Sequence, residues 1–261
     1  MNEREVTFED KQGRKIVGTL LIPDWTKQVP VVILCHGFKG DRNEKHIRAI
    51  SDELCKGGLA SLRIDFTRDP GESSLHFEDF TISYELEVLD QAVNFVKSQK
   101  EIDPNKIGLA GHSLGGLVVA WYVATHPDIA ALATLSAVYN FEKTWRHEYS
   151  DTINEFKEKG FANFHSTHLN RVLKLKAGFY DDALSYDMDK VIESLVCPIL
   201  VVAGTDDQAV TMDHAQNFYD RAFSKEKQLK VIKGSDHNYT KEGNLDEVKT
   251  AVADWFAKTL L

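Results

Sequence analysis

Short apolar segments alternate along most of the chain with longer segments in which apolar residues recur at helical spacing. The apolar segments predict buried strands at Pro30–His36, Leu59–Asp65, Ile107–Gly111, Ala130–Ser136, Pro198–Gly204 and Gln228–Ile232. The amphipathic segments predict helices at Glu44–Lys56, Tyr84–Lys97 and Leu245–Leu260, and a hairpin of Glu5–Asp10 and Arg14–Ile22 comes first. Strands that alternate with helices form a mostly parallel sheet flanked by helices, so we expect one α/β domain over residues 1–261.

The alternation stops between Tyr139 and Leu195, a segment far longer than a single connection between parallel strands requires. Helix-like stretches, Asn140–Lys159 and Tyr186–Ser194, flank short strands or mixed structure between Phe161 and Leu175. We expect residues 139–195 to form an inserted cap whose aromatic side chains line a pocket. The candidate pocket residues are Trp145, Phe164 and Phe179. The alternative is that these aromatics only pack the cap onto the core.

The motif with the most chemical content is Gly111-His112-Ser113-Leu114-Gly115, which fits the G-x-S-x-G nucleophile elbow. A predicted strand leads into it and a helix-like run, 116–123, leads out. Such a sharp turn between strand and helix holds the central hydroxyl above the sheet edge, beside a helix N-terminus. Ser113 is therefore the candidate nucleophile. The alternative is a glycine-rich turn with an ordinary N-capping serine.

Hydrolases with this elbow place an acid and then a histidine after the serine in the chain. Asp206 and Asp207 follow the predicted strand that ends at Gly204, and His237 follows the strand that ends at Ile232. The imidazole would take the proton of the serine, and the carboxylate would orient the imidazole. Adjacent residues of a turn point differently, so only one aspartate can reach the histidine. We favour Asp207 and assign Asp206 to a solvated loop.

The chain has ten histidines, and His237 is singled out by its position. It alone follows a predicted strand, after the acid and before the last amphipathic helix. His46 and His214 fall in predicted helices, where we expect surface positions. His112 lies inside the elbow, where we expect it to pack beneath the turn, and His126 precedes Pro127 at a helix end.

An oxyanion formed at the substrate carbonyl needs hydrogen-bond donors. The backbone N–H of Leu114, directly after the candidate nucleophile, is one candidate. A second donor normally comes from the loop after an early strand, and here that loop is 36–40. Gly37 would let the backbone approach closely, and the N–H of Phe38 would donate. The alternative is a simple turn at the end of a strand.

Together these segments resemble the α/β-hydrolase superfamily over almost the whole chain. Within it, the sequence is similar to small carboxylesterases related to cinnamoyl (feruloyl) esterases. The stretches that carry the resemblance are Leu34–Phe38, Leu62–Phe66, Gly111–Gly116, Pro198–Val210 and Gly234–Asn238. The resemblance implies hydrolysis of carboxylic esters, short-chain or of the aryl and cinnamoyl type, without a cofactor.

The chain departs from the esterase pattern at two places. The family usually continues Arg-x-Asp-Phe with a His-Gly-x-Ser turn, whereas this chain has the loop Thr67–Ser73. Because we expect that loop near the site, the departure bears on acyl-group preference. Leu114 also stands where feruloyl-active relatives often carry glutamine, which removes a polar side chain but keeps the backbone donor.

Composition limits the partners. Of 261 residues, 43% are hydrophobic, and the formal net charge is −9, which argues against binding to nucleic acid or anionic membranes. No apolar run approaches twenty residues, and the first residues lack the pattern of a secretory signal, so we expect a cytoplasmic protein. Cys35, Cys55 and Cys197 are odd in number and are interpreted as reduced core residues. Neither zinc-ligand spacing nor a phosphate-binding loop occurs, so we expect no metal and no cofactor.

Three classes of function fit these residues. The first is a serine carboxylesterase acting on a small-molecule ester through an acyl-enzyme on Ser113. The second is a serine peptidase, or an acyl transferase or thioesterase, with the same three residues. The third is a binding protein without catalysis, a class that typically lacks one of the three. A serine at the elbow excludes dehalogenases, which need a carboxylate there. The sequence leaves a homodimer open.

Overall fold

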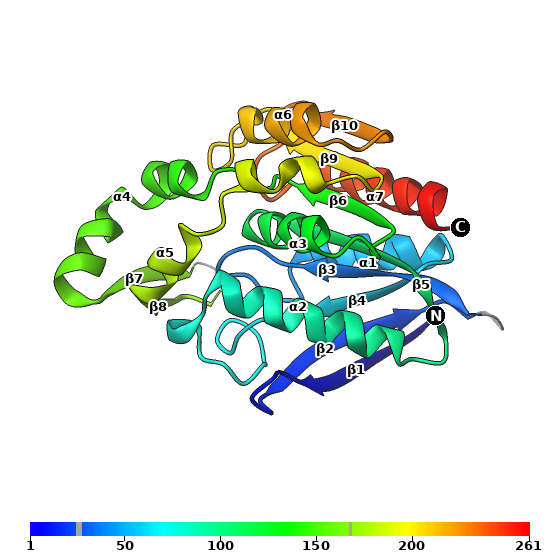
Figure 1. The fold of residues 1–261 in the computed structure, drawn as a ribbon, viewed down its shortest axis with the longest axis horizontal. Helices are drawn as coiled ribbons and strands as arrows, with labels where there is room; N and C mark the ends of the chain where they lie inside the picture. The colour runs from blue at the N-terminus through cyan, green and yellow to red at the C-terminus, as the bar shows by residue number, and fades with distance from the viewer. Residues whose placement is uncertain (25–27, 167–168) are drawn as a thin grey trace.

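The computed structural model describes residues 1–24, 28–166 and 169–261, and eight of its strands form one sheet (Figure 1). Their order is β1-β2-β4-β3-β5-β6-β9-β10. The bounds are β1 Asn2–Glu9, β2 Lys15–Ile22, β3 Val29–Cys35, β4 Ala60–Ile64, β5 Ile102–His112, β6 Ala131–Leu135, β9 Ile199–Gly204 and β10 Lys227–Ile232. Only β1 with β2 and β2 with β4 pair antiparallel, and the other pairs are parallel. The predicted mostly parallel α/β sheet is confirmed.

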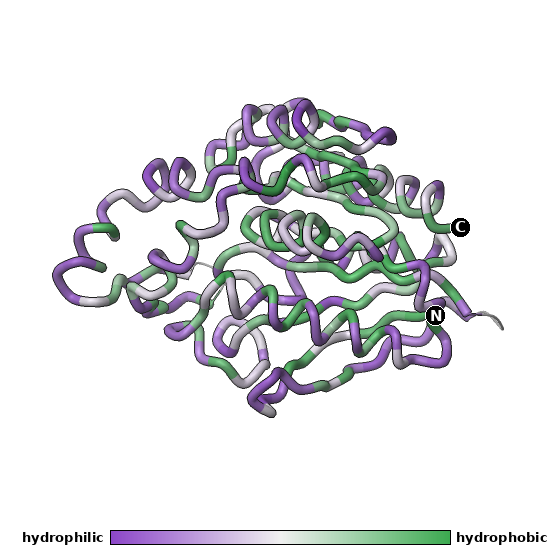
Figure 2. The backbone as a smooth tube through the Cα atoms, in the orientation of Figure 1, coloured by the Kyte–Doolittle hydropathy of each residue, from purple (hydrophilic) through white to green (hydrophobic). Residues whose placement is uncertain are grey.

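Helices cover both faces of this sheet (Figure 1). Helices α1 (Lys45–Lys56) and α7 (Asn244–Leu260) pack together on one face, and α2 (Ile82–Lys97), α3 (Leu114–Thr125) and α6 (Met212–Arg221) lie on the other. Successive residues of the buried strands therefore enter different apolar layers: Val31 and Ile33 face one, and Val32 and Leu34 face the other. Figure 2 shows apolar residues concentrated on the central strands and polar residues along the outer helices.

The segment predicted as a cap connects β6 to β9 and lies at one end of the sheet (Figure 1). Its elements are α4 Phe141–Lys159, β7 Phe161–Ser166, β8 Arg171–Lys176, α5 Gly178–Ala183 and two short 3₁₀ helices, η2 Met188–Lys190 and η3 Ile192–Ser194. Strands β7 and β8 form an antiparallel pair of their own, and α4 bends at Tyr149, where the backbone leaves helical geometry. The predicted helix-like stretch 186–194 is thus two 3₁₀ turns. Residues 167 and 168 of the segment lie outside the described residues.

Two predictions about histidines are wrong. His46 and His214 are buried rather than exposed. The imidazole of His46 packs against that of His112, with ring centroids 4.3 Å apart. Nδ1 of His214 accepts a hydrogen bond of 2.9 Å from the backbone N–H of Tyr139, at the start of the cap segment.

All three cysteines are free thiols. Cys35 and Cys55 are buried as expected, but Cys197 is partly exposed. Among the described residues, no helix combines the length and the apolar character needed to cross a membrane.

Candidate active site

Ser113 occupies the turn between β5 and α3 in a strained conformation, with φ 55° and ψ −118°. A residue other than glycine rarely adopts positive φ, and the surrounding structure must enforce it. Here the Ser113 N–H donates to the carbonyl of Leu135 at 2.9 Å, and its carbonyl accepts from the Val138 N–H at 3.0 Å. The turn is therefore held by the end of β6 and the segment after it.

The glycines of the elbow allow a close approach of backbones. A Cβ on Gly111 would lie 2.2 Å from the carbonyl oxygen of Gly115, and a Cβ on Gly115 would lie 2.3 Å from that of His36. Side chains at these positions would force the strand and helix apart. The spacing of the motif thus follows from the sharpness of the turn.

His237 contacts Asp207, the favoured aspartate. Nδ1 of His237 lies 2.7 Å from Oδ2 of Asp207, whose side chain is almost fully buried. The other carboxylate oxygen accepts from the backbone N–H groups of Ala209 and Val210, at 3.0 and 2.8 Å. Since a carboxylate only accepts, Nδ1 carries a hydrogen, and in the neutral imidazole the lone pair is then on Nε2. That tautomer can accept a proton at Nε2.

Asp206 points away from this pair. Its side chain is half exposed and forms an ion pair of 2.6 Å with Lys241. The ammonium of Lys241 holds the pKa of Asp206 below its ordinary value. The adjacent aspartates therefore differ as expected: one is buried against His237 and the other is solvated.

The loop after β3 lies directly against the elbow. A Cβ on Gly37 would lie 3.0 Å from the Cβ of Ser113, so this close approach favours glycine. Phe38 and Leu114 line the same cavity as Ser113. Leu114 is the first residue of α3, where a backbone N–H has no acceptor within the helix and the helix dipole is positive. The two predicted donor residues are thus both at the nucleophile turn.

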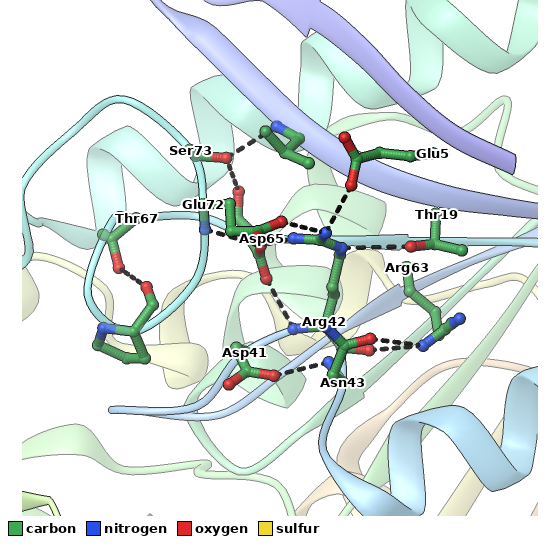
Figure 3. A network of polar contacts seen from close by, with 12 residues as sticks. Glu5, Thr19, Asp41, Arg42, Asn43, Arg63, Asp65, Thr67, Glu72 and Ser73 are labelled. Atoms are coloured by element: carbon green, nitrogen blue, oxygen red, sulfur yellow. Dashed lines mark hydrogen bonds and ion pairs between the residues drawn. The ribbon is translucent and has the colours of Figure 1, made fainter. Parts of the chain in front are cut away.

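A polar network anchors the same loop further along (Figure 3). Asp65, buried just after β4, accepts from the backbone N–H of Arg42 at 2.7 Å and forms an ion pair with its guanidinium. The guanidinium also contacts Glu72 and reaches Glu5 at 3.1 Å. A buried pair of this kind is costly to break, because the remaining charge would lose its partner. The network fixes the loop that carries Phe38.

The same network corrects the expectation for the Thr67–Ser73 loop. Asp65 accepts hydrogen bonds from the backbone N–H of Glu72 at 2.9 Å and from the hydroxyl of Ser73 at 2.7 Å. None of residues 67–73 is among those that line the cavity at Ser113. The loop is therefore tied to Asp65 and does not line this cavity.

The cavity at Ser113 has a volume of about 420 Å³. It brings together the elbow, the loop after β3, the His237 loop and the cap segment. The lining residues are Gly37, Phe38, Lys39, Glu44, His112, Ser113, Leu114, Val138, Phe141, Thr144, Trp145, Glu148, Tyr149, His165, Ser166, Ala209, Val210, His237 and Asn238. Its volume suits a small organic molecule.

Two family models match this chain, each over more than half of its length. The Prolyl oligopeptidase family matches residues 85–261, and the Dienelactone hydrolase family matches residues 16–153. Both models cover the elbow. The chain belongs to the α/β-hydrolases.

Relatives agree with this assignment. The structure of Est1E from Butyrivibrio proteoclasticus with bound ferulic acid is similar with a TM-score of 0.79 and 26% identity, over 97% of this chain and 98% of that one. The esterase domain of a Rhodothermus marinus protein gives a TM-score of 0.75 at 23% identity, over 100% of both chains. A thermostable monoacylglycerol lipase from Bacillus sp. is 22% identical over 254 residues, 90% of this chain and 94% of the relative. The predicted resemblance to feruloyl-esterase-like hydrolases is confirmed.

The cap segment of this hydrolase contributes part of the cavity wall. Trp145 lines the cavity as expected, together with Phe141 and Tyr149. Phe164 and Phe179 do not: they are buried and pack on the ring of Phe38, with centroids 5.3 and 5.5 Å away. For these two, the structure favours packing of cap onto core over contact with a bound molecule.

Sequence spacing did not indicate a cluster of buried acceptors beneath the elbow of the hydrolase. The atoms are Glu44 Oε2, His46 Nε2 and His112 Nδ1, within 4.8 Å of one another and without hydrogen-bond partners among the described residues. Nε2 of His112 lies 2.9 Å from the carbonyl oxygen of His237, so it carries the hydrogen and leaves Nδ1 bare. His112 therefore connects the elbow to the loop of His237.

Burial sets the protonation of this cluster. It lowers the pKa of His46 to about 3 and that of His112 well below the ordinary value. Burial, helped by Asp41, raises the pKa of Glu44 to about 8. At neutral pH the cluster therefore holds two neutral imidazoles and a protonated carboxyl group, with Glu44 Oε2 3.7 Å from His46 Nε2.

Glu44→Gln should make the hydrolase more stable than the wild type at alkaline pH. The unfolded wild type loses the Glu44 proton near pH 4.5 and the folded protein near pH 8, so its stability falls as pH rises across this window. Glutamine does not ionise, so the variant lacks this loss of stability. The Glu44 side chain is 26% exposed, which reduces the full effect of the pKa shift. We expect the free energy of unfolding of the variant at pH 9 to exceed that of the wild type by on the order of 2–3 kcal/mol.

Urea unfolding at pH 5 and pH 9 measures this difference, with Glu158→Gln on the exposed surface of α4 as the matched control. An equal pH dependence for wild type and Glu44→Gln would contradict the protonated state of Glu44.

Proposed function

We propose that this hydrolase is a serine carboxylesterase that cleaves small carboxylic esters through an acyl-enzyme on Ser113. The observation that carries the proposal is the 2.7 Å contact between His237 and the buried Asp207, at a cavity that His237 shares with Ser113. A carboxylate, an imidazole of fixed tautomer and a hydroxyl on a strained elbow are the parts that serine hydrolases use.

In this mechanism Ser113 Oγ attacks the carbonyl carbon of the ester, and Nε2 of His237 takes its proton. Asp207 keeps the imidazole oriented and stabilises the imidazolium that forms. The backbone N–H groups of Phe38 and Leu114 stabilise the oxyanion. His237 then gives the proton to the departing alcohol, and water repeats the sequence to release the acid and regenerate Ser113.

The cavity favours short-chain or aryl esters over long chains. Its volume of about 420 Å³ accommodates a small substrate, and Phe141, Trp145 and Tyr149 offer aromatic surface. Est1E, with which the chain shares its fold at 26% identity, has been solved with ferulic acid bound. We therefore expect methyl ferulate among the substrates.

A peptidase is the second candidate, because the Prolyl oligopeptidase family model covers residues 85–261. Acyl transfer to a thiol or alcohol acceptor uses the same three residues. The test is a panel of p-nitrophenyl esters from acetate to palmitate, with methyl ferulate and an amino-acid anilide added. Cleavage of short esters or ferulate supports the esterase, whereas cleavage of the anilide alone would replace it with a peptidase. Mass spectrometry after treatment with an organophosphonate should locate the adduct on Ser113.

Trp145→Phe should shift preference toward longer acyl chains. Trp145 lines the cavity, and the smaller ring of phenylalanine would widen it while keeping its wall apolar. The substitution also removes the hydrogen bond of 3.1 Å that the Trp145 Nε1 donates to Thr152. One or two methylene groups in an apolar pocket are worth about 1–3 kcal/mol. The ratio of kcat/KM for the octanoate ester to that for the butyrate ester should rise about tenfold.

Phe156→Leu is the control, because Phe156 packs behind Trp145, with ring centroids 6.2 Å apart, and is not a lining residue. Equal shifts for both variants would show that the cap acts through packing alone.

A further inference from the structure

Lys39 is placed in the cavity by its backbone. It follows Phe38 in the loop after β3, and its φ is 62°, a conformation that costs a lysine free energy. Its side chain lines the same cavity as Ser113 and His237. A strained conformation that brings a charged side chain to a cavity indicates a use for that charge.

The ammonium of Lys39 lies among aromatic rings. Its Nζ is 5.6 Å from the ring centroid of Phe38, 5.1 Å from that of Tyr149 and 5.9 Å from that of Phe164. Aromatic faces stabilise a cation that has lost part of its hydration, and they do so without accepting its hydrogen bonds. No carboxylate of the described residues lies within ion-pair distance of Nζ. The three N–H donors of the ammonium are thus available to a molecule in the cavity.

Two carboxyl groups also line the cavity, and neither neutralises Lys39. Glu44 faces His46, 3.7 Å away, in the buried acceptor cluster. Glu148 lies 3.6 Å from His147 and is 31% exposed. Burial lowers the pKa of Lys39, and the charge of Glu148 opposes that shift from beyond contact distance. Glu148 is therefore the carboxylate in the cavity whose negative charge weakens the attraction of Lys39 for an anion, although the two form no ion pair.

We propose that Lys39 forms an anion subsite in the cavity, and that the preferred substrates are esters carrying a carboxylate. The proposal rests on the proposed esterase function and names its substrate class. The anion can belong to the acyl group, as in a half-ester of a dicarboxylic acid. It can also belong to the alcohol, as in an ester formed by the phenolic hydroxyl group of a hydroxybenzoic acid. In both cases Lys39 donates to the carboxylate while Ser113 attacks the ester carbonyl.

Two pairs of substrates test this, and within each pair a carboxylate replaces a methyl group. Monomethyl succinate against methyl butyrate tests the acyl side, and 4-carboxyphenyl acetate against 4-methylphenyl acetate tests the alcohol side. The readout is the ratio of kcat/KM within a pair, so a loss of activity that affects both substrates equally leaves the ratio unchanged. The variants are Lys39→Met, Lys39→Arg and Glu148→Gln. Lys174→Met, which removes an ammonium over Phe161 outside the cavity, is the control.

Hydrogen bonds to charged groups are worth enough to change affinity about 10-fold to 100-fold. In at least one pair, Lys39→Met should therefore lower the carboxylate-to-methyl ratio at least about tenfold, chiefly through KM. Lys39→Arg should retain most of the ratio, Glu148→Gln should raise it, and Lys174→Met should leave it as in the wild type.

A ratio that Lys39→Met leaves unchanged in both pairs, with its melting temperature equal to that of the wild type, would overturn the subsite. Failure of the wild type to cleave any of the four esters is a separate outcome. It would overturn the esterase function itself and the subsite with it.

Discussion

Ser113→Ala should abolish ester hydrolysis and leave the fold intact. In related serine hydrolases, loss of the nucleophile lowers kcat on the order of 10⁶-fold, because the hydroxyl, the imidazole and the carboxylate act as one unit. The measurement is kcat for p-nitrophenyl butyrate with purified protein, together with the melting temperature.

Ser113→Gly is a second variant without a nucleophile, and it controls for backbone strain. Ser113 has φ 55°, which glycine adopts without the steric cost that alanine retains. Glycine should therefore melt no lower than alanine, and both should be inactive. Wild-type turnover in either variant would remove Ser113 from the mechanism.

Features encoded in one short segment were predicted well. The elbow needs glycines at fixed spacing from the serine, because the strand and the helix approach so closely that no Cβ fits between them. This requirement can be recognised in a motif of five residues. The divergence of adjacent side chains in a turn predicted that only one of Asp206 and Asp207 reaches the histidine, and the favoured Asp207 is the one that contacts His237. The order of strands and helices followed from hydrophobic periodicity, and the parallel sheet followed from that order.

Features that depend on segments distant in sequence were missed. Glu44 caps the N-terminus of α1, His46 lies in its first turn and His112 ends β5, so only the folded chain shows their side chains close together. The burial of His46 was open to prediction, since Ile50 and Leu54 lie four and eight residues further along α1 on its buried face. Phe164 and Phe179 were assigned to the pocket by composition. Composition does not show that both rings pack on Phe38, which lines the cavity while they do not.

Asp207→Asn should be severely impaired, and Asp206→Asn should be nearly normal. Asparagine at 207 would keep the shape of the side chain, but its amide favours the wrong imidazole tautomer, a change worth roughly 10⁴-fold in kcat in a well-studied serine protease. Asp207 also accepts from two backbone N–H groups within its own turn, so its loss should cost some stability as well.

Asp206 is the matched control, because it is the neighbouring carboxylate in the same loop and differs only in direction. Its half-exposed ion pair with Lys241 is screened by solvent and contributes little to stability. We therefore expect kcat of Asp206→Asn within about threefold of the wild type, since the side chain touches neither His237 nor the cavity lining. Values of kcat and melting temperatures of the two variants, measured in parallel, separate catalysis from stability. If Asp206→Asn lost activity and Asp207→Asn kept it, the carboxylate that orients His237 during turnover would be Asp206, and the 2.7 Å contact would not be the working one.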